Sequence, residues 1–450
     1  MQKHKSSKKF KTALLKSILV FGIFISPFAF AENPLVTQAK ELQTGSEKVG
    51  IDHQKAIVLL KKAVDEGDAE AMYLLSQYYA GYSQFAYLPE NPSINHELLM
   101  KSAKLGNLDA IDEIISSPEI AKEASQITSS PTVLQEFKPI LQKEIRNKNI
   151  QAIHLMAKMM ELQPTSSFTA ICELYVQAYH LEKSLETLSH LVKCSDQNLQ
   201  KFDMPERQTI FAEQDKMLRE QAKDMLASKS LQIEERKALS YYLHTLNIED
   251  EFQNFAKRLD KDIQNFYLKL GHQGYSDAYL MLQEENIISP NYLKWQDQAV
   301  RLNNRVALAE AGYAYLYGEM DRKKNQKLGL EYLEKSIQLN DANAMNTLAI
   351  WLINESENSQ DHDKALKLLE RAAQLKSTEA MKNLARISAS PDNYMWAVRA
   401  YNNGANTDVA INEGILPLVL EAYKNGIGVK KDKAMVNKIT QELTKYDAKE

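Results

Sequence analysis

The sequence predicts an all-α protein, a right-handed α-solenoid of antiparallel helix pairs. The first observation is a small share of turn-forming residues, 15 glycines and 12 prolines among 450 residues, which is about half of the average share of roughly 12%. The second is that no segment of useful length alternates like a strand. The third is a helix–turn–helix pattern that recurs about every 36 residues, which is typical of stacked repeats.

The first 31 residues have the three parts of a secretory signal peptide. A basic head precedes an apolar run from Ser17 to Phe28, and Ala29-Phe30-Ala31 provides a cleavage site of small residues. The basic residues of the head are Lys3, Lys5, Lys8, Lys9, Lys11 and Lys16. We therefore expect cleavage after Ala31 and a periplasmic or secreted protein. A membrane anchor is the alternative, although the apolar run is short for a span of about 20 residues.

The remaining chain is acidic. Without the six lysines of the head, 49 of the 55 basic residues remain against 59 acidic ones. Such a chain, without a basic block, is a poor binder of nucleic acid. No second apolar run of spanning length follows, so we expect no integral membrane segment after signal removal. The residue directly after the cleavage site is Glu32 and not a cysteine, which argues against a bacterial lipid anchor.

The first clear repeat lies within residues 52–79. Apolar side chains in its first helix recur at helical spacing, Gly67 lies where that helix must end, and a small residue opens the next helix. The two stripes consist of Ala56, Leu59, Leu60 and Ala63, then Ala71, Leu75 and Tyr79. One pair cannot bury its own apolar face, so neighbouring pairs should stack and share one core.

The same small or apolar position returns in the C-terminal part at intervals of 35 to 37 residues, at Ala307, Ala344, Ala380 and Ile415. Two motifs there carry a family resemblance. Residues 311–318 read Ala-Gly-x-x-Tyr-x-x-Gly, and residues 420–434 read Leu-x-x-Tyr-x-x-Gly-x-Gly-Val-x-x-Asp-x-Ala. They resemble the Sel1-like repeat, a tetratricopeptide-like helix pair, and the resemblance extends over about 52–115 and 265–440.

This resemblance divides the chain after the signal peptide into three parts. We expect N-terminal Sel1-like repeats at 32–115, degenerate helical hairpins at 116–264 and C-terminal Sel1-like repeats at 265–450. Gly67 and Gly106 are 39 residues apart, so the junction at 82–92 holds extra residues.

The resemblance implies a non-enzymatic scaffold or adaptor for protein–protein interaction. The chain is also similar, in size and in its exported repeat array, to the family of the alginate-secretion scaffold AlgK. We therefore expect protein partners in the cell envelope and a role in assembling an envelope or exopolysaccharide-secretion complex. The alternatives are a secreted factor that binds host proteins and a β-lactam-binding or hydrolysing enzyme. Relatives with the enzymatic link carry a cysteine pair in each repeat, which this chain lacks.

No residue is expected to be catalytic, cofactor-binding or metal-binding. The nine histidines form neither a His-x-x-x-His nor a His-Glu-x-x-His pair. The sequence also lacks a P-loop, a dinucleotide fingerprint and a Gly-x-Ser-x-Gly elbow.

The two cysteines, Cys172 and Cys194, are expected to form a disulfide, because exported proteins fold in an oxidising compartment. Residues 168–195 read as a helical hairpin that turns near 181–184. The two cysteines would then lie level in an antiparallel pair, as the bond geometry requires. Two buried free thiols are the alternative.

Partner binding is expected on a concave face lined by the second helix of each pair. The positions two residues further along the helix from its core positions lie outside the core stripe and should face this groove. They are Tyr73, Gln77, Tyr313, Tyr317, Asn346, Ile350, Lys382, Arg386 and Glu421. Tyrosine and arginine are frequent at interface hot spots. The alternative sites are a chain terminus and the aromatic junction that contains Tyr82, Phe85 and Tyr87. A loop with three aromatic residues more often folds back onto the core, and only an exposed junction would be a binding site.

Overall fold

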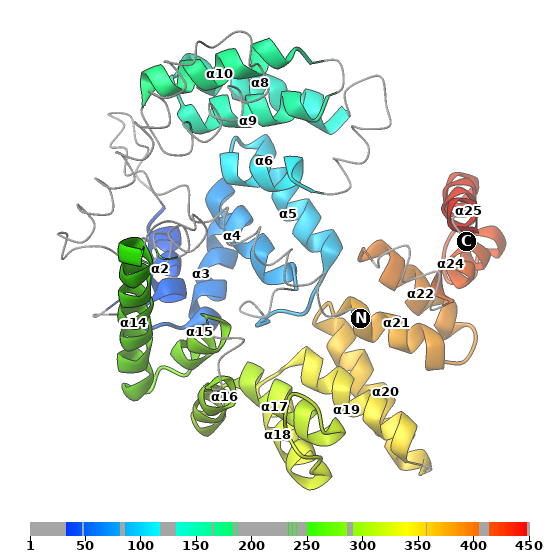
Figure 1. Ribbon diagram of the computed structural model, residues 1–450. Coiled ribbons are helices and arrows are strands. Elements are labelled where there is room, and N and C mark those ends of the chain that lie inside the picture. The colour runs from blue at the N-terminus through cyan, green and yellow to red at the C-terminus, as the bar shows by residue number, and fades with distance from the viewer. Residues whose placement is uncertain are drawn as a thin grey trace. The chain divides into compact units, whose positions relative to one another are not determined.

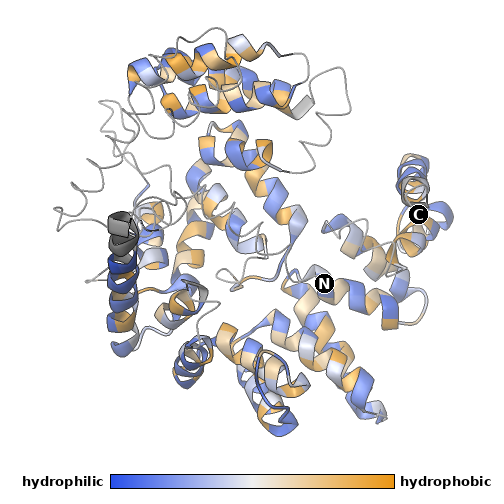
Figure 2. Cartoon of the chain, viewed as in Figure 1, coloured by the Kyte–Doolittle hydropathy of each residue, from blue (hydrophilic) through white to orange (hydrophobic). Residues whose placement is uncertain are grey.

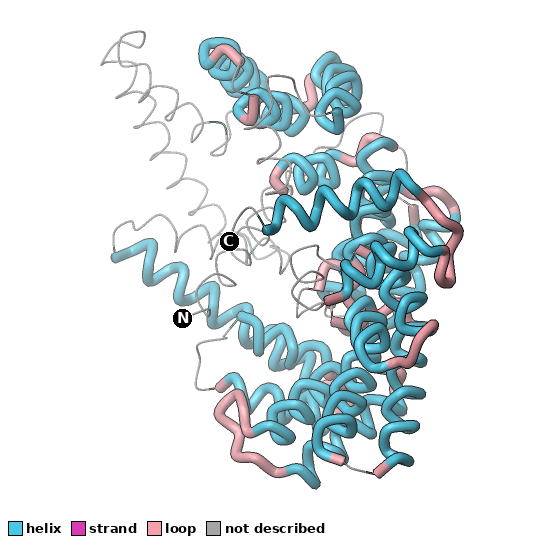
Figure 3. The backbone as a smooth tube through the Cα atoms, turned by 90° about the vertical axis from the view of Figure 1, so that its right-hand side faces the viewer, coloured by secondary structure: helices cyan, strands magenta, loops and turns pink. Residues whose placement is uncertain are grey.

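The computed structural model describes residues 33–46, 49–81, 86–117, 132–163, 166–182, 187, 233, 236, 240, 250–285, 291–356, 358–404 and 414–447. Every regular element in these ranges is a helix, and loops join the helices (Figure 3). None of the described helices combines the length and apolarity that a bilayer span requires. The predicted signal peptide, with its cleavage site at Ala31, lies outside the described residues, and so does Cys194.

The helices follow one another in the order shown in Figure 1. Those in the N-terminal part are α2 (Pro34–Thr44), α3 (His53–Asp65), α4 (Ala69–Tyr79), α5 (Pro92–Lys104), α6 (Leu108–Ile115), α8 (Thr132–Arg146), α9 (Ile150–Glu161) and α10 (Phe168–Leu181). Those in the C-terminal part are α14 (Asp250–His272), α15 (Asp277–Glu285), α16 (Tyr292–Arg301), α17 (Arg305–Tyr317), α18 (Gln326–Gln338), α19 (Ala342–Glu355), α20 (Ser359–Gln374), α21 (Thr378–Ile387), α22 (Asp392–Asn402), α24 (Ile415–Asn425) and α25 (Lys433–Asp447). Consecutive helices pack on each other, α17 on α18 and α19 on α20 among them, which confirms the all-α solenoid of helix pairs.

The chain forms two compact units. The first unit includes Asp68–Tyr73 and Leu99–Phe266, and the second includes Leu35–Gly67, Leu74–Leu98 and Tyr267–Glu450. The division of the sequence at 32–115, 116–264 and 265–450 stays a prediction.

In the second unit, the helices from α17 to α25 share one continuous apolar core. Apolar and polar residues are interleaved along these helices (Figure 2). The core side chains come from successive helices and include Leu333, Leu348, Leu369, Leu384 and Val419. A core shared between neighbouring pairs is what makes a stack of repeats stable.

In the first unit, α5, α6, α8 and α9 enclose a separate core. Ile111, Leu134, Phe137 and Leu141 are fully buried in it. Within the segment expected to hold degenerate hairpins, α8 packs on α9 and α10 packs against α9.

The tight turns between helices share one backbone arrangement. A residue with positive φ ends the first helix, and the next residue caps the second helix with its side chain. These pairs are Gly67–Asp68, Gly106–Asn107, Lys148–Asn149, Asn303–Asn304, Asn340–Asp341 and Lys376–Ser377. In each case, the capping oxygen accepts a hydrogen bond from the N–H of the alanine three residues later. The cap thereby satisfies a donor that has no partner inside the helix.

A close approach of α17 and α18 explains two glycines. A Cβ on Gly312 would lie 2.8 Å from Cγ of Leu333, and a Cβ on Gly329 would lie 2.8 Å from the backbone nitrogen of Leu316. Only a residue without a side chain fits at either position, so these glycines set the distance between the two helices.

We expect Asn149→Ala to destabilise the protein by about 1 kcal/mol, because the N–H of Ala152, 3.1 Å from the Asn149 oxygen, loses its cap. Lys148→Gly should stabilise it by up to about 1 kcal/mol, since Lys148 has a φ of 61° that costs an L-residue energy. Urea unfolding midpoints measure both effects, with the exposed Asn147→Ala as the control. A midpoint for Asn149→Ala equal to that of the control would contradict the capping role.

Candidate functional site

The residues predicted to bind a partner lie on second helices. In the second unit, α17 carries Tyr313 and Tyr317, α19 carries Asn346 and Ile350, α21 carries Lys382 and Arg386, and α24 carries Glu421. We call these seven residues the second-helix face. In the N-terminal part, Gln77 and Tyr73 both lie on α4.

The Tyr73 side chain packs against the core of the first unit. Burial raises the pKa of its hydroxyl strongly, and the carboxylates of Glu113, Asp109 and Glu70 add to the effect. Tyr73 is thus a half-buried residue of that core rim. Gln77 is half-buried as well.

The two tyrosines on α17 form a pair on the second-helix face. The ring centroids of Tyr313 and Tyr317 are 4.9 Å apart, with the ring planes tilted by 48°. Tyr317 is 37% exposed, and Arg386 and Glu421 are exposed as well. Asn346 accepts a hydrogen bond of 2.8 Å from Nδ2 of Asn383, so its amide links α19 to α21. Ile350, one turn after Asn346 on α19, is half-buried.

A short non-helical segment within the second unit, residues 86–91, packs against turns between the later helices of that unit. We call it the docked segment. Tyr87 is its anchor, with only 4% of the residue exposed. The Tyr87 hydroxyl donates to Oδ1 of Asp277 and accepts a 3.0 Å hydrogen bond from Asn304. The guanidinium of Arg305 lies 5.2 Å from the centre of the Tyr87 ring and donates to the Tyr87 carbonyl oxygen.

Asp277 is the common acceptor at this anchor. Besides Tyr87, it accepts hydrogen bonds from Nδ2 of Asn304 at 2.7 Å and from the backbone N–H of His53 at 3.0 Å. Burial raises the pKa of the Tyr87 hydroxyl well above its usual range, and the neighbouring Asp277 carboxylate adds to this effect. Tyr87 therefore stays a neutral hydrogen-bond donor.

Asn91 forms the second anchor of the docked segment. Its side-chain nitrogen donates to the carbonyl oxygen of Lys376 at 2.9 Å and to the side-chain oxygen of Asn403 at 3.1 Å. Its side-chain oxygen accepts from the N–H of Ile94 at 3.0 Å and so caps α5. The docked segment thus reaches from the turns before α15 and α17 to the turn before α21. We call these turns the turn row.

Lys382 is expected to face an open groove, but its side chain is buried. It is 8% exposed, and its ammonium group forms a 2.6 Å ion pair with Glu379. Glu90 of the docked segment lies close enough for both charges to act on it: burial raises the pKa of its carboxyl, Glu379 raises it further, and Lys382 lowers it. The second-helix face near the start of α21 is therefore shielded by the chain itself.

The docked segment contains one residue of the aromatic junction. Tyr87 is buried within the second unit and cannot offer its ring to a partner, as expected of an aromatic loop that folds back onto the core. Tyr82 and Phe85 lie outside the described residues. The hydrogen-bond partners of Tyr87 had no local signal in the sequence.

The perturbed carboxyl groups of the second unit have structural causes. Burial raises the pKa of Glu310, although Gln283 and Gln296 donate hydrogen bonds to it. Burial also raises the pKa of Asp341, against the effects of its capping bond to Ala344 and of nearby Arg305. Each of these carboxyl groups is occupied by partners from the fold.

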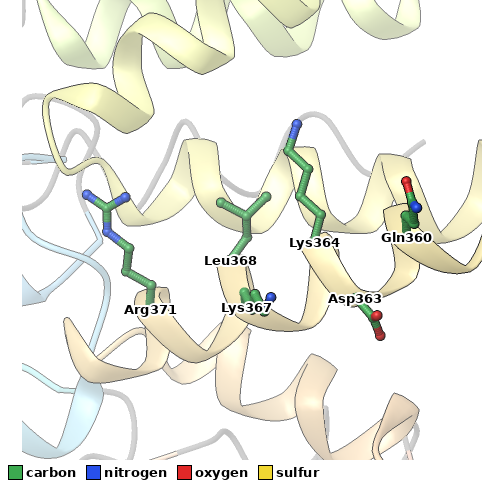
Figure 4. Close-up of a pocket in the computed structure, with 6 residues that line it drawn as sticks. All are labelled: Gln360, Asp363, Lys364, Lys367, Leu368 and Arg371. Carbon is green, nitrogen blue, oxygen red and sulfur yellow. The ribbon is translucent and has the colours of Figure 1, made fainter.

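A surface depression on α20 is lined by Gln360, Asp363, Lys364, Lys367, Leu368 and Arg371 (Figure 4). All six come from one helix. Lys364 lies 3.7 Å from a carboxylate oxygen of Glu334, and Arg371 donates to Asn340, so these two cations hold neighbouring repeats together. Among the described residues, no group of three or more His, Cys, Asp or Glu side chains is placed to hold a metal ion.

Cys172 is buried on α10 in the first unit. Its expected partner Cys194 lies outside the described residues, so the pairing stays a prediction.

Segments of the chain match the family model of the Sel1 repeat. The family model matches five segments of the chain, residues 39–68, 69–107, 305–341, 344–377 and 421–435. These segments correspond to helix pairs such as α4 with α5, α17 with α18, and α19 with α20. The two motifs quoted from the C-terminal part both lie in or at matched segments. No match was found among curated proteins.

Two solved structures are similar to the chain. One is the crystal structure of c5321, a protective antigen present in uropathogenic Escherichia coli strains that displays an SLR fold, with 15% identity, a TM-score of 0.34, and coverage of 92% of this chain and 87% of that one. The other is a Sel1 repeat protein from Oxalobacter formigenes, with 15% identity, a TM-score of 0.35, and coverage of 58% of this chain and 99% of that one.

We expect Tyr87→Phe to destabilise the protein by about 1 to 3 kcal/mol, because Asp277 and Asn304 would each lose one buried hydrogen bond. Tyr332→Phe is the matched control, since the half-buried Tyr332 hydroxyl makes no hydrogen bond to the described part of the chain. Thermal unfolding midpoints of the two variants test this. Equal midpoints would mean that the Tyr87 hydroxyl does not hold the docked segment.

Proposed function

Because the chain contains Sel1 repeats, we propose that it is a scaffold whose second-helix face binds a segment of another protein of the cell envelope. Sel1 repeats imply protein partners. The proposal adds the surface that binds the partner and the compartment in which binding takes place.

The docked segment is the observation that carries this proposal. The turn row holds a non-helical stretch of chain by an aromatic anchor at Tyr87 and by an asparagine that bonds the Lys376 carbonyl oxygen. Short peptide segments of a partner are bound by similar combinations of side-chain anchors and backbone hydrogen bonds. The turn row therefore has the chemistry that such binding requires, and here it serves the chain itself.

The part of the second-helix face beyond the docked segment is open. Tyr317 and Arg386 are exposed there, and they belong to residue types enriched at interface hot spots. A partner segment that lies beside the docked segment would meet these side chains first. We therefore assign the main contacts to Tyr313, Tyr317, Ile350 and Arg386.

Export is the second element of the proposal. It is supported by the basic head, the apolar run and the small residues that end at Ala31. An exported scaffold would assemble envelope or exopolysaccharide-secretion proteins. The same face would serve a secreted protein that binds host proteins.

Site-specific photo-crosslinking in the native cells tests the proposal. With p-benzoyl-phenylalanine in place of Tyr317, we expect a discrete crosslinked product that disappears when Tyr313 and Arg386 are also replaced by alanine. The same probe at Lys367, on α20 in the second unit, is the matched control and should give no such product. Equal products from both positions, or a product that survives both alanine replacements, would contradict binding at this face.

A further inference from the structure

The ring centroids of the tyrosine pair on α17 are 4.9 Å apart, and two acidic residues lie at nearby helix ends. Glu319 follows α17 by two residues, and Glu355 is the last residue of α19, which packs against α17. Glu319 and Glu355 are both exposed. Burial raises the pKa of the Tyr317 hydroxyl, and Tyr313, Glu355 and Glu319 raise it further. Burial and then Glu319 act in the same direction on Tyr313. Each charged group that acts on the two phenols is thus negative.

Neither the Glu319 nor the Glu355 carboxylate is paired with a cation in the part of the chain that the structure describes. No described Lys or Arg lies over the ring of Tyr313 or Tyr317. The face of an aromatic ring attracts a cation, and a nearby carboxylate strengthens this attraction. The four side chains therefore present a negative surface with aromatic walls.

Elsewhere in the second unit, a tyrosine and a glutamate do hold a cation. The Tyr401 hydroxyl lies 3.2 Å from Oε2 of Glu442, and the ammonium of Lys438 lies 5.5 Å from the centre of the Tyr401 ring. Lys438 is also 3.9 Å from Oε1 of Glu442. There, a tyrosine and a glutamate hold a cation that the chain supplies.

Other aromatic residues of the second unit are likewise paired with a cation. Arg322 lies 4.8 Å from the ring centre of Tyr315, and Arg399 lies 4.5 Å from that of Trp396. Tyr315 is on α17, two residues from Tyr313 and Tyr317. On α17, the ring of Tyr315 is thus paired with Arg322 from the loop that follows the helix. The rings of Tyr313 and Tyr317, which belong to the second-helix face, have no such cation among the described residues.

We infer that Tyr313, Tyr317, Glu319 and Glu355 form a recognition site for an arginine side chain of the partner segment. This inference rests on the proposed function of the second-helix face. The guanidinium would lie against the two rings and pair with the two carboxylates. A second copy of this chain is a poorer occupant, because the acidic chains repel one another: 49 basic residues face 59 acidic ones after the predicted cleavage.

Fluorescence anisotropy of a labelled peptide tests the inference on the purified protein. The probe is fluorescein-(Arg-Gly)4, and its comparison peptide carries citrulline in place of arginine, which removes the charge but keeps the shape. We expect the citrulline peptide to bind at least about fivefold more weakly, the scale of an exposed cation–aromatic contact. Equal binding of the two peptides would overturn the inference.

Variants show whether the binding belongs to this site. We expect Glu319→Gln with Glu355→Gln, and separately Tyr313→Leu with Tyr317→Leu, to weaken binding of the arginine peptide at least about fivefold. Glu173→Gln with Glu370→Gln changes two exposed carboxylates elsewhere and should leave binding unchanged. An equal loss in this control would mean general attraction to an acidic protein and would overturn the site.

Two further measurements keep the outcome decisive. Tyr313→Phe with Tyr317→Phe retains both rings and should bind within about twofold of the natural protein, which separates ring recognition from misfolding. Sedimentation at increasing concentration shows whether the four residues mediate self-association, which would overturn the assignment to a partner's arginine. If crosslinks at Tyr317 persist while the arginine and citrulline peptides bind equally, only this inference fails and the proposed function stands.

Discussion

The cap at the start of six second helices is the interaction on which the structure depends. It places an Asp, Asn or Ser after a residue of positive φ and joins that side chain to the N–H of a recurring alanine. The cap fixes where the second helix begins, and the small alanine lets that helix pack close to its neighbours. Since these pairs turn in the same way, consecutive pairs can share one core.

The same turns then provide the surface for the docked segment. Asn304 caps α17 with its side-chain oxygen and uses its nitrogen to hold Tyr87 and Asp277. Lys376 uses the carbonyl oxygen of its strained turn to bind Asn91. The polar groups that form these turns thus also bind the docked segment. A row of such turns can therefore act as a recognition surface.

The helix pairs could be predicted from the sequence because their signals are local. The spacing of Ala307, Ala344 and Ala380 and the glycines at 318 and 426 follow from helix periodicity and turn geometry. The partners of Tyr87 and the burial of Lys382 could not be predicted, because they depend on contacts between residues about 200 to 300 positions apart in the sequence. The caps themselves had a sequence signal, an Asp, Asn or Ser three residues before each recurring alanine.

Contact between the docked segment and α21 is the most direct test of this account. With p-benzoyl-phenylalanine in place of Glu90 in the purified protein, irradiation followed by peptide mass spectrometry should give an intramolecular crosslink to the peptide that contains Glu379 and Lys382. The same probe at the exposed Val58 on α3 serves as the control and should not label that peptide. If position 90 crosslinks only to its sequence neighbours, the turn row does not hold the docked segment.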